Sequence, residues 1–254
     1  MRIVLLASLG FHPVSQKPRI APDEARALAL ALAASLAGAD IIALHAGPAD
    51  RAEPVLRPLL GMGAVLLRLV DLAPDADIVA PLAAELVALA PDIIVAGTIA
   101  EIGEGSGMVP FLVAERLGRP VIAGATALAL AMGRAEIVTA LAGGRRRRLA
   151  TALPLVLTVD AKGPPARLSA FAPARRGRVE RVVATARCDA AADWSRRPAR
   201  PRPKRLDGPK SEADTVATGR QVIADTSPEA AAEAILSYLR RHGFAAGPST
   251  SSNE

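Results

Sequence analysis

Short, continuously apolar runs alternate along residues 1–124 with longer segments in which alanine and leucine recur at helical spacing. The apolar runs are five to seven residues long and cover residues 2–8, 40–46, 65–70, 92–96 and 120–124. The helical segments cover residues 22–37, 52–60, 75–89 and 107–117. Such alternation is typical of βαβ units, and strands that are apolar throughout have helices packed on both faces. We therefore expect an α/β fold, a Rossmann-like parallel twisted sheet with helices on both faces.

The pattern changes after residue 125. Three short runs joined by glycine-containing turns indicate antiparallel additions to the sheet, at residues 126–132, 136–141 and 147–151. One more apolar strand follows at residues 154–160. Together these elements predict one α/β domain over residues 1–182.

The remaining residues, 183–254, have a different composition. The stretch "RRPARPRPKRLDGP", residues 196–209, cannot form a core and predicts a linker. Ser227 and Pro228 suit the N-cap and the first position of a helix over residues 227–242. A lone helix behind a linker indicates an extended C-terminal arm that docks on a partner. We expect the last residues, "GPSTSSNE", to be disordered.

The net charge of +6 raises the question of nucleic-acid binding. The excess arginine lies in residues 145–148, 175–181 and 196–210, where no aromatic side chain could stack on a base. We interpret these arginines as solvated or facing a protein partner. No apolar stretch reaches the roughly 18 residues of a membrane span. Cys188 is the only cysteine, so we expect no disulfide, no cysteine-based metal site and a cytoplasmic protein.

The segment "GTIAEIGEGSG", residues 97–107, joins a predicted strand to a predicted helix. Glycine lets the backbone approach a ligand closely, and the N-terminus of the following helix favours an anion such as a phosphate. Residues 6–8, 21–24 and 46–48 should meet this loop, because ligands of open α/β sheets bind beyond the carboxyl ends of the strands. The common phosphate-binding motifs are missing from the sequence. The segment is therefore either a phosphate-binding loop or a plain connection, and both interpretations stay open.

No convincing catalytic set is present. The three histidines lie far apart in the sequence, and His45, inside a predicted strand, is expected to be a satisfied core residue. Glu101 and Glu104 have no paired acid or metal ligand nearby in the sequence, so we expect solvated carboxylates. The sequence thus predicts neither catalytic residues nor a metal site.

Four longer passages carry a family resemblance. They are residues 21–33 ("APDEARALALALA"), 46–70 ("AGPADRAEPVLRPLLGMGAVLLRLV"), 91–122 ("PDIIVAGTIAEIGEGSGMVPFLVAERLGRPVI") and 153–176 ("LPLVLTVDAKGPPARLSAFAPARR"). In this order they resemble the β subunits of electron transfer flavoproteins, including the FixA-type members. The resemblance implies a fold of the adenine nucleotide α-hydrolase-like kind. This sequence differs from the family at Ala21, where the family has asparagine, and in the composition of the 97–107 loop.

The resemblance implies an electron carrier subunit, not an enzyme in its own right. Its partner would be an α subunit that holds most of the FAD, and electrons would pass from a flavin-dependent dehydrogenase to an acceptor such as a quinone reductase. This chain would bury an AMP, or a second FAD in electron-bifurcating members. The implied nucleotide contacts are Leu6, Ala7, Ala21, Pro22, Asp23, Glu24, Ala46, Gly97, Thr98, Ile99, Gly103, Glu104, Gly105, Ser106 and Gly107. A recognition loop near residues 161–175 would dock the dehydrogenase through Arg167, Leu168 and Phe171.

Two alternatives remain. One is a stand-alone adenine-nucleotide-binding protein of the α-hydrolase-like class, against which the orphan helix at 227–242 argues. The other is a β subunit whose 97–107 loop closes over the interface without a nucleotide. This alternative stays open because a protein can keep a fold after the binding site on it is lost.

Overall fold

A computed structural model describes residues 1–34, 39–74, 76–102, 105–131, 133–184, 186 and 226–244. The chain divides into two compact units, residues 1–196 and 197–254. The candidate site lies wholly in the first unit.

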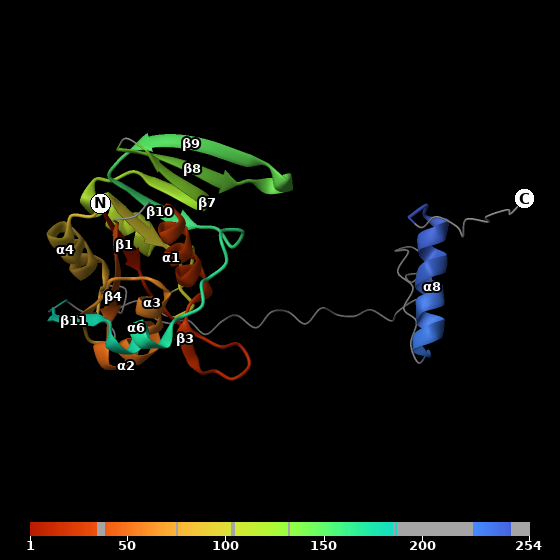
Figure 1. Cartoon of the computed structure of the whole chain (residues 1–254), viewed down its shortest axis with the longest axis horizontal. Helices are drawn as coiled ribbons and strands as arrows, with labels where there is room; N and C mark the ends of the chain where they lie inside the picture. Colours follow the sequence, from red (N-terminus) through yellow and green to blue (C-terminus); the bar gives the residue numbers. More distant parts are fainter. Residues whose placement is uncertain are drawn as a thin grey trace, which may run out of the picture. The chain divides into compact units, whose positions relative to one another are not determined.

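A nine-stranded sheet forms the centre of the first unit (Figure 1). Its order is β11–β5–β4–β1–β6–β10–β7–β8–β9. Seven of the described strands pair in parallel: β1 (Arg2–Leu6), β4 (Asp40–Gly47), β5 (Leu66–Asp71), β6 (Ile93–Ala96), β7 (Val121–Ala131), β10 (Leu155–Val159) and β11 (Arg178–Val183). Two more extend one edge in antiparallel fashion, β8 (Arg134–Ala140) and β9 (Arg146–Ala152). The predicted α/β class, with its parallel sheet and antiparallel additions, is confirmed.

Helices cover both faces of this sheet. One face packs against α1 (Pro22–Ala34), α2 (Ala49–Leu56) and α3 (Pro58–Met62). The other face packs against α4 (Val79–Leu89) and α5 (Val109–Leu117). Alternate residues of each strand supply the two cores: on β1, Ile3 and Leu5 face the first set of helices, and Val4 and Leu6 face the second. Both cores are needed because a parallel strand buries both of its faces.

The helix boundaries follow from local chemistry. Pro58 has no backbone N–H, so the segment predicted as one helix at 52–60 is two short helices that meet at Arg57. The helix predicted to begin at residue 75 begins at Val79, where the Asp77 carboxylate accepts a hydrogen bond from the Val79 N–H at 2.9 Å. Gly118 ends α5 in the left-handed conformation, φ 62°, that glycine adopts readily.

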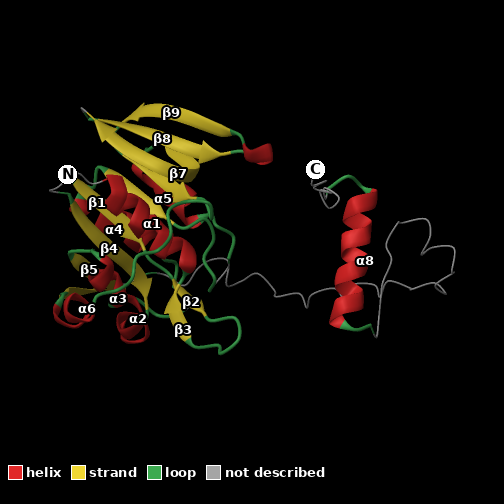
Figure 2. Cartoon of the chain, turned by 45° about the vertical axis from the view of Figure 1, so that its right-hand side comes forward, coloured by secondary structure: helices red, strands yellow, loops and turns green. Residues whose placement is uncertain are grey.

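Several elements differ from the sequence prediction. The runs at 120–124 and 126–132 are one strand, β7, which shifts register between Ala125 and Ala127. A hairpin of β2 (Leu9–Phe11) and β3 (Pro18–Ile20) was not predicted and is visible in Figure 2. Helix α6 (Phe171–Arg176) and strand β11 were not predicted either.

Strand β11 lies at the edge of the sheet beside β5, and ion pairs hold it there. Arg181 donates to Asp50 at 2.7 Å and to Glu53 at 2.6 Å, both on α2. Arg178 and Arg68 both pair with Glu180. The basic segment at 175–181 was predicted to face solvent or a partner, but two of its arginines form ion pairs within this unit.

The second unit contributes one described helix, α8 (Pro228–Arg241). The Ser227 hydroxyl caps it by accepting from the Ala230 N–H at 3.2 Å, and Pro228 occupies its first position, as predicted. The linker at 196–209 and the tail at 247–254 lie outside the described residues. That this region is a docking arm stays a prediction.

Candidate functional site

The order of the sheet reverses beside β1. The chain runs outward from β1 to β4 and β5, then returns to place β6 on the other side of β1. The carboxyl ends of these strands are level, because Leu6 pairs with both Leu44 and Ala96. A crevice at such a switch point is where open α/β sheets bind ligands.

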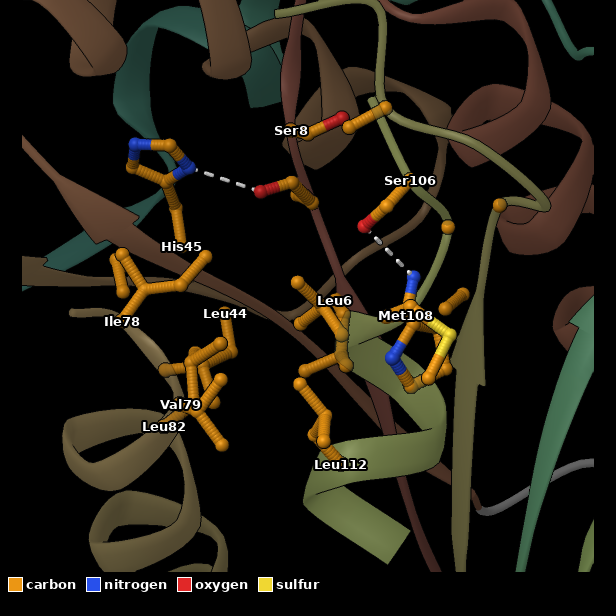
Figure 3. A pocket seen from close by; sticks show the side chains of 18 of the residues that line it. Leu6, Ser8, Leu44, His45, Ile78, Val79, Leu82, Ser106, Met108 and Leu112 are labelled. Atoms are coloured by element: carbon orange, nitrogen blue, oxygen red, sulfur yellow. Dashed lines mark hydrogen bonds between the residues drawn. The ribbon is translucent and has the colours of Figure 1, made fainter. Parts of the chain in front are cut away.

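A cavity of about 590 Å³ opens at this switch point. Its wall combines the ends of β1, β4 and β6, the 97–107 loop, the first turn of α4 and one side of α5. Figure 3 shows side chains from these elements converging on one space. The volume suits a small-molecule ligand.

One end of the cavity is apolar (Figure 3). The side chains that form it come from both strands and helices: Leu6, Leu44, Ile78, Val79, Leu82 and Leu112. The flat faces of an aromatic ring such as a nucleobase would lose their hydration here against apolar side chains.

The other end is polar and carries the N-terminus of α5. The Ser106 hydroxyl accepts from the Met108 N–H at 3.3 Å, while Met108 itself provides no side-chain cap for the helix. Gly105 and Gly107 have φ values of 65° and 71°, and a Cβ on Gly107 would lie 2.7 Å from the Thr98 carbonyl oxygen. The loop can therefore fold this tightly only with glycine at residue 107. The positive end of the helix dipole attracts an anion, although Pro110 in this first turn has no N–H of its own.

Glu24 brings a buried carboxyl to the same wall. It lies in the first turn of α1, is 3% exposed, and accepts a hydrogen bond from the Ser8 hydroxyl. Its other oxygen, Oε2, is buried and has no hydrogen-bond partner among the described residues. Burial raises the pKa of this carboxyl from 4.5 to about 7. Gly97 packs so closely against Glu24 that a Cβ on residue 97 would lie 3.1 Å from the Glu24 carboxyl carbon Cδ.

His45 lines the cavity from the end of β4. Its Nδ1–H donates to the Ala7 carbonyl at 2.8 Å, which leaves Nε2 as the unprotonated nitrogen. Burial lowers its pKa, so the ring is neutral. Nε2 is buried without a partner in the described part of the chain, so the expectation of a fully satisfied core histidine is met only at Nδ1.

The structure brings nine of the residues singled out from the sequence to the cavity wall: Leu6, Ala7, Glu24, Ala46, Gly97, Thr98, Gly105, Ser106 and Gly107. It does not bring Ala21, Pro22, Asp23 or Ile99 there. Gly103 and Glu104 lie outside the described residues. Whether any of these residues contacts a nucleotide stays a prediction.

Ser8, in the predicted stretch 6–8, lines the cavity, whereas sequence reasoning missed His45 as a wall residue and the first turn of α4. The contribution of α4 could not be found from the sequence, because it depends on tertiary packing: α4 lies against α5, and its Ile78 and Val79 line the cavity.

Glu101 has a structural partner, which corrects the expectation of a solvated carboxylate. It pairs with Arg19 at 2.8 Å and accepts from the Phe11 N–H at 3.0 Å. The β2–β3 hairpin is thereby tied to the 97–107 loop. Glu104, for which the same was expected, lies outside the described residues.

The predicted recognition loop projects apolar side chains from a fixed base. Ser169 donates to the Pro58 carbonyl at 2.9 Å, and the Ala170 N–H donates to the Gly61 carbonyl at 3.0 Å. Leu168 is 95% exposed and Phe171 is 76% exposed. Arg167, the third predicted docking residue, is exposed beside them.

The described residues contain neither a membrane-spanning helix nor a metal-binding cluster. No helix there is long and apolar enough to span a bilayer. No group of three or more histidine, cysteine, aspartate or glutamate side chains in the same residues could hold a metal ion.

The fold and the cavity define an α/β chain with a ligand cavity at its topological switch point. Residues 14–187 match the family described as "Electron transfer flavoprotein domain". The chain is also 41% identical over 253 residues to a protein of Chromohalobacter salexigens named "Electron transfer flavoprotein subunit beta", with 94% of each chain covered. The chain belongs to the electron transfer flavoprotein β-subunit family, as the four sequence passages predicted.

Proposed function

We propose that this chain is the β subunit of a heterodimeric electron transfer flavoprotein. An α subunit carrying FAD is its partner, and the complex takes electrons from a flavin-dependent dehydrogenase and delivers them to an acceptor such as a quinone reductase. The observation that carries this proposal is the 41% identity to a β subunit along 94% of both chains. The electron chemistry would be supplied by FAD when it is bound.

The cavity at the switch point is the proposed site of an AMP. Its apolar end, around Leu44, Ile78 and Val79, suits an adenine ring, and the start of α5 suits the phosphate. Gly105, Ser106 and Gly107 would let the backbone come close to that phosphate. A second FAD in place of AMP would be bound in the same way, with its adenine in the apolar end of the cavity and its phosphate at the start of α5.

The exposed recognition loop is the proposed contact for the dehydrogenase. Leu168 and Phe171 are large apolar side chains that gain little from the fold while they face solvent. The hydrogen bonds of Ser169 and Ala170 to the α3 region hold the base of the loop still, so little ordering entropy is lost on docking. Helix α8, whose Ile235, Leu236 and Tyr238 are also exposed, is the proposed contact for the α subunit.

Co-expression with a cognate α subunit tests the proposal. We expect a yellow complex with one copy of each chain and FAD bound. A matched truncated chain that ends at residue 225 lacks α8 and should yield less complex. A full-length chain that is folded, colourless and never co-purifies with the α subunit would refute the proposal, and turnover of ATP by that lone chain would favour a stand-alone nucleotide-binding protein.

A further inference from the structure

Glu24 places a buried carboxyl in the cavity wall, and the charges that act on it from the described residues are all negative. The residue is 3% exposed, and its Oε2 has no hydrogen-bond partner among the described residues. Its described hydrogen-bond partner, the Ser8 hydroxyl, is neutral. A buried charge of this kind is costly unless it is paired, so the neutral form of the carboxyl is favoured.

The charged groups nearest Glu24 reinforce this preference. Asp23, on the same helix, and Glu101, on the 97–107 loop, both act on it as negative charges. Arg19, on β3, is held by Glu101 at 2.8 Å. Across the cavity His45 is neutral. The remaining titratable side chains of the wall are Asp77, Glu115 and Arg116.

An anionic ligand would add to this negative field. A phosphate monoester carries about −1.5 to −2 charges at neutral pH. The proposed phosphate position at the start of α5 and the Glu24 carboxyl share one cavity of about 590 Å³. Like charges in such a confined space disfavour each other, so the ligand and an ionised Glu24 oppose each other.

We propose that Glu24 is a proton-linked determinant of ligand affinity: the cavity binds a nucleoside phosphate with Glu24 in its neutral, protonated form. Where Glu24 is ionised beforehand, binding takes up one proton from solvent onto the carboxyl. The inference rests on the proposed function, since it assumes that the cavity binds a nucleoside phosphate.

The titration of Glu24 falls in the range where such a linkage is measurable. Burial raises its pKa to about 7 without ligand, so both forms are populated near neutral pH. A phosphate in the cavity would raise the pKa further. Affinity is therefore greatest at low pH and falls as the pH rises above 7, because the protonated fraction of the ligand-free protein falls. A pKa difference of one between the free and bound states gives a tenfold loss.

The test is calorimetric titration of AMP into the complex of the full-length chain with its α subunit, after removal of endogenous AMP. For the wild type we expect binding at least about fivefold weaker at pH 8.5 than at pH 6.5, because this range covers most of the tenfold change that a pKa difference of one gives. Glu24→Gln, which keeps the shape of the neutral acid, should remove this loss. The phosphate of AMP also titrates near pH 6, but it does so equally with both proteins. Glu136→Gln, at an exposed residue of β8, is the matched control and should follow the wild type.

The outcomes separate the two proposals. Parallel pH profiles for the wild type and Glu24→Gln would overturn the proton linkage and leave AMP binding intact. No AMP binding by either protein at any pH would overturn the proposed AMP site itself. If Glu24→Gln fails to assemble, wild-type titrations in two buffers of different ionisation enthalpy decide, because proton uptake near zero at pH 7.5 contradicts the linkage.

Discussion

Replacing Glu24 by glutamine should make the ligand-free chain less sensitive to high pH. The folded state raises the pKa of Glu24 from 4.5 to about 7 because the carboxyl is buried. A carboxyl with a raised pKa destabilises the fold when it ionises. This cost is absent below about pH 4.5, grows as the pH rises, and is fully present above about pH 7.

The size of the effect follows from the shift in pKa. Since one pKa unit corresponds to 1.36 kcal/mol, ionised Glu24 costs the fold about 3 kcal/mol. Glutamine can still accept the hydrogen bond from Ser8, but its buried amide adds a cost of its own at every pH. The informative quantity is therefore the change with pH, not the stability at one pH.

The assay is urea unfolding of the AMP-free wild type and of Glu24→Gln at pH 4.5 and pH 8. Between these values the wild type should lose about 3 kcal/mol relative to the variant. Glu136→Gln should track the wild type, since that side chain is exposed. If the gap between wild type and Glu24→Gln changes by less than about 0.5 kcal/mol, Glu24 is not an unpaired buried carboxyl and the reasoning fails.

The other predictions concern the loop, the core and the docking surface. Gly107→Ala should cost roughly 2 kcal/mol or more in urea unfolding, because its φ is 71° and the new Cβ would lie 2.7 Å from the Thr98 oxygen. Gly118→Ala, at φ 62° with open space around it, should cost about 1 kcal/mol, and equal costs would contradict the close-contact argument. Leu86→Ala should cost about 2–5 kcal/mol because this α4 side chain is fully buried in the core between the helix and the sheet; a loss below 1 kcal/mol would place it outside the core. Leu168→Ala should leave stability within about 0.5 kcal/mol yet slow electron transfer from the dehydrogenase in stopped-flow assays, and an unchanged rate would remove it from the docking surface.

Sequence patterns predicted the parallel sheet because a strand that is buried on both faces appears in the sequence as a continuous apolar run. The Ile93–Ala96 strand is four buried apolar residues, and the Leu155–Val159 strand is buried throughout. The 2–8 run was predicted correctly as a strand for the same reason, although β1 ends at Leu6. Capping residues predicted the start of α8 equally well, since Ser227 and Pro228 act locally.

Elements that are held in place by tertiary contacts have no such apolar run in the sequence. The strands of the β2–β3 hairpin have three residues each and contain Gly10 and Pro18, which are unfavourable in strands. Strand β11, with the sequence RVERVV, mixes charged and apolar residues without strict alternation, and it joins the sheet through its pairing with β5 and the ion pairs of Arg181. Neither local preference nor periodicity could reveal these partners.

The cavity was predictable in position but not in chemistry. The carboxyl ends of the strands and the glycine-rich loop could be assigned from the sequence, and Glu24 was among the residues named. Its burial, its bond to Ser8 and its unpaired Oε2 depend on how α1 meets β1 and β6. The same holds for Nε2 of His45.

The proposed function places a nucleotide in this chain and a flavin in its partner. Extraction of the purified complex and mass spectrometry of the released nucleotides measure both at once. We predict one FAD and one AMP for each pair of chains, with the AMP lost from a complex that carries Gly107→Ala. A complex that releases FAD in equal amount to the chains and no second nucleotide would contradict the proposed role of the cavity.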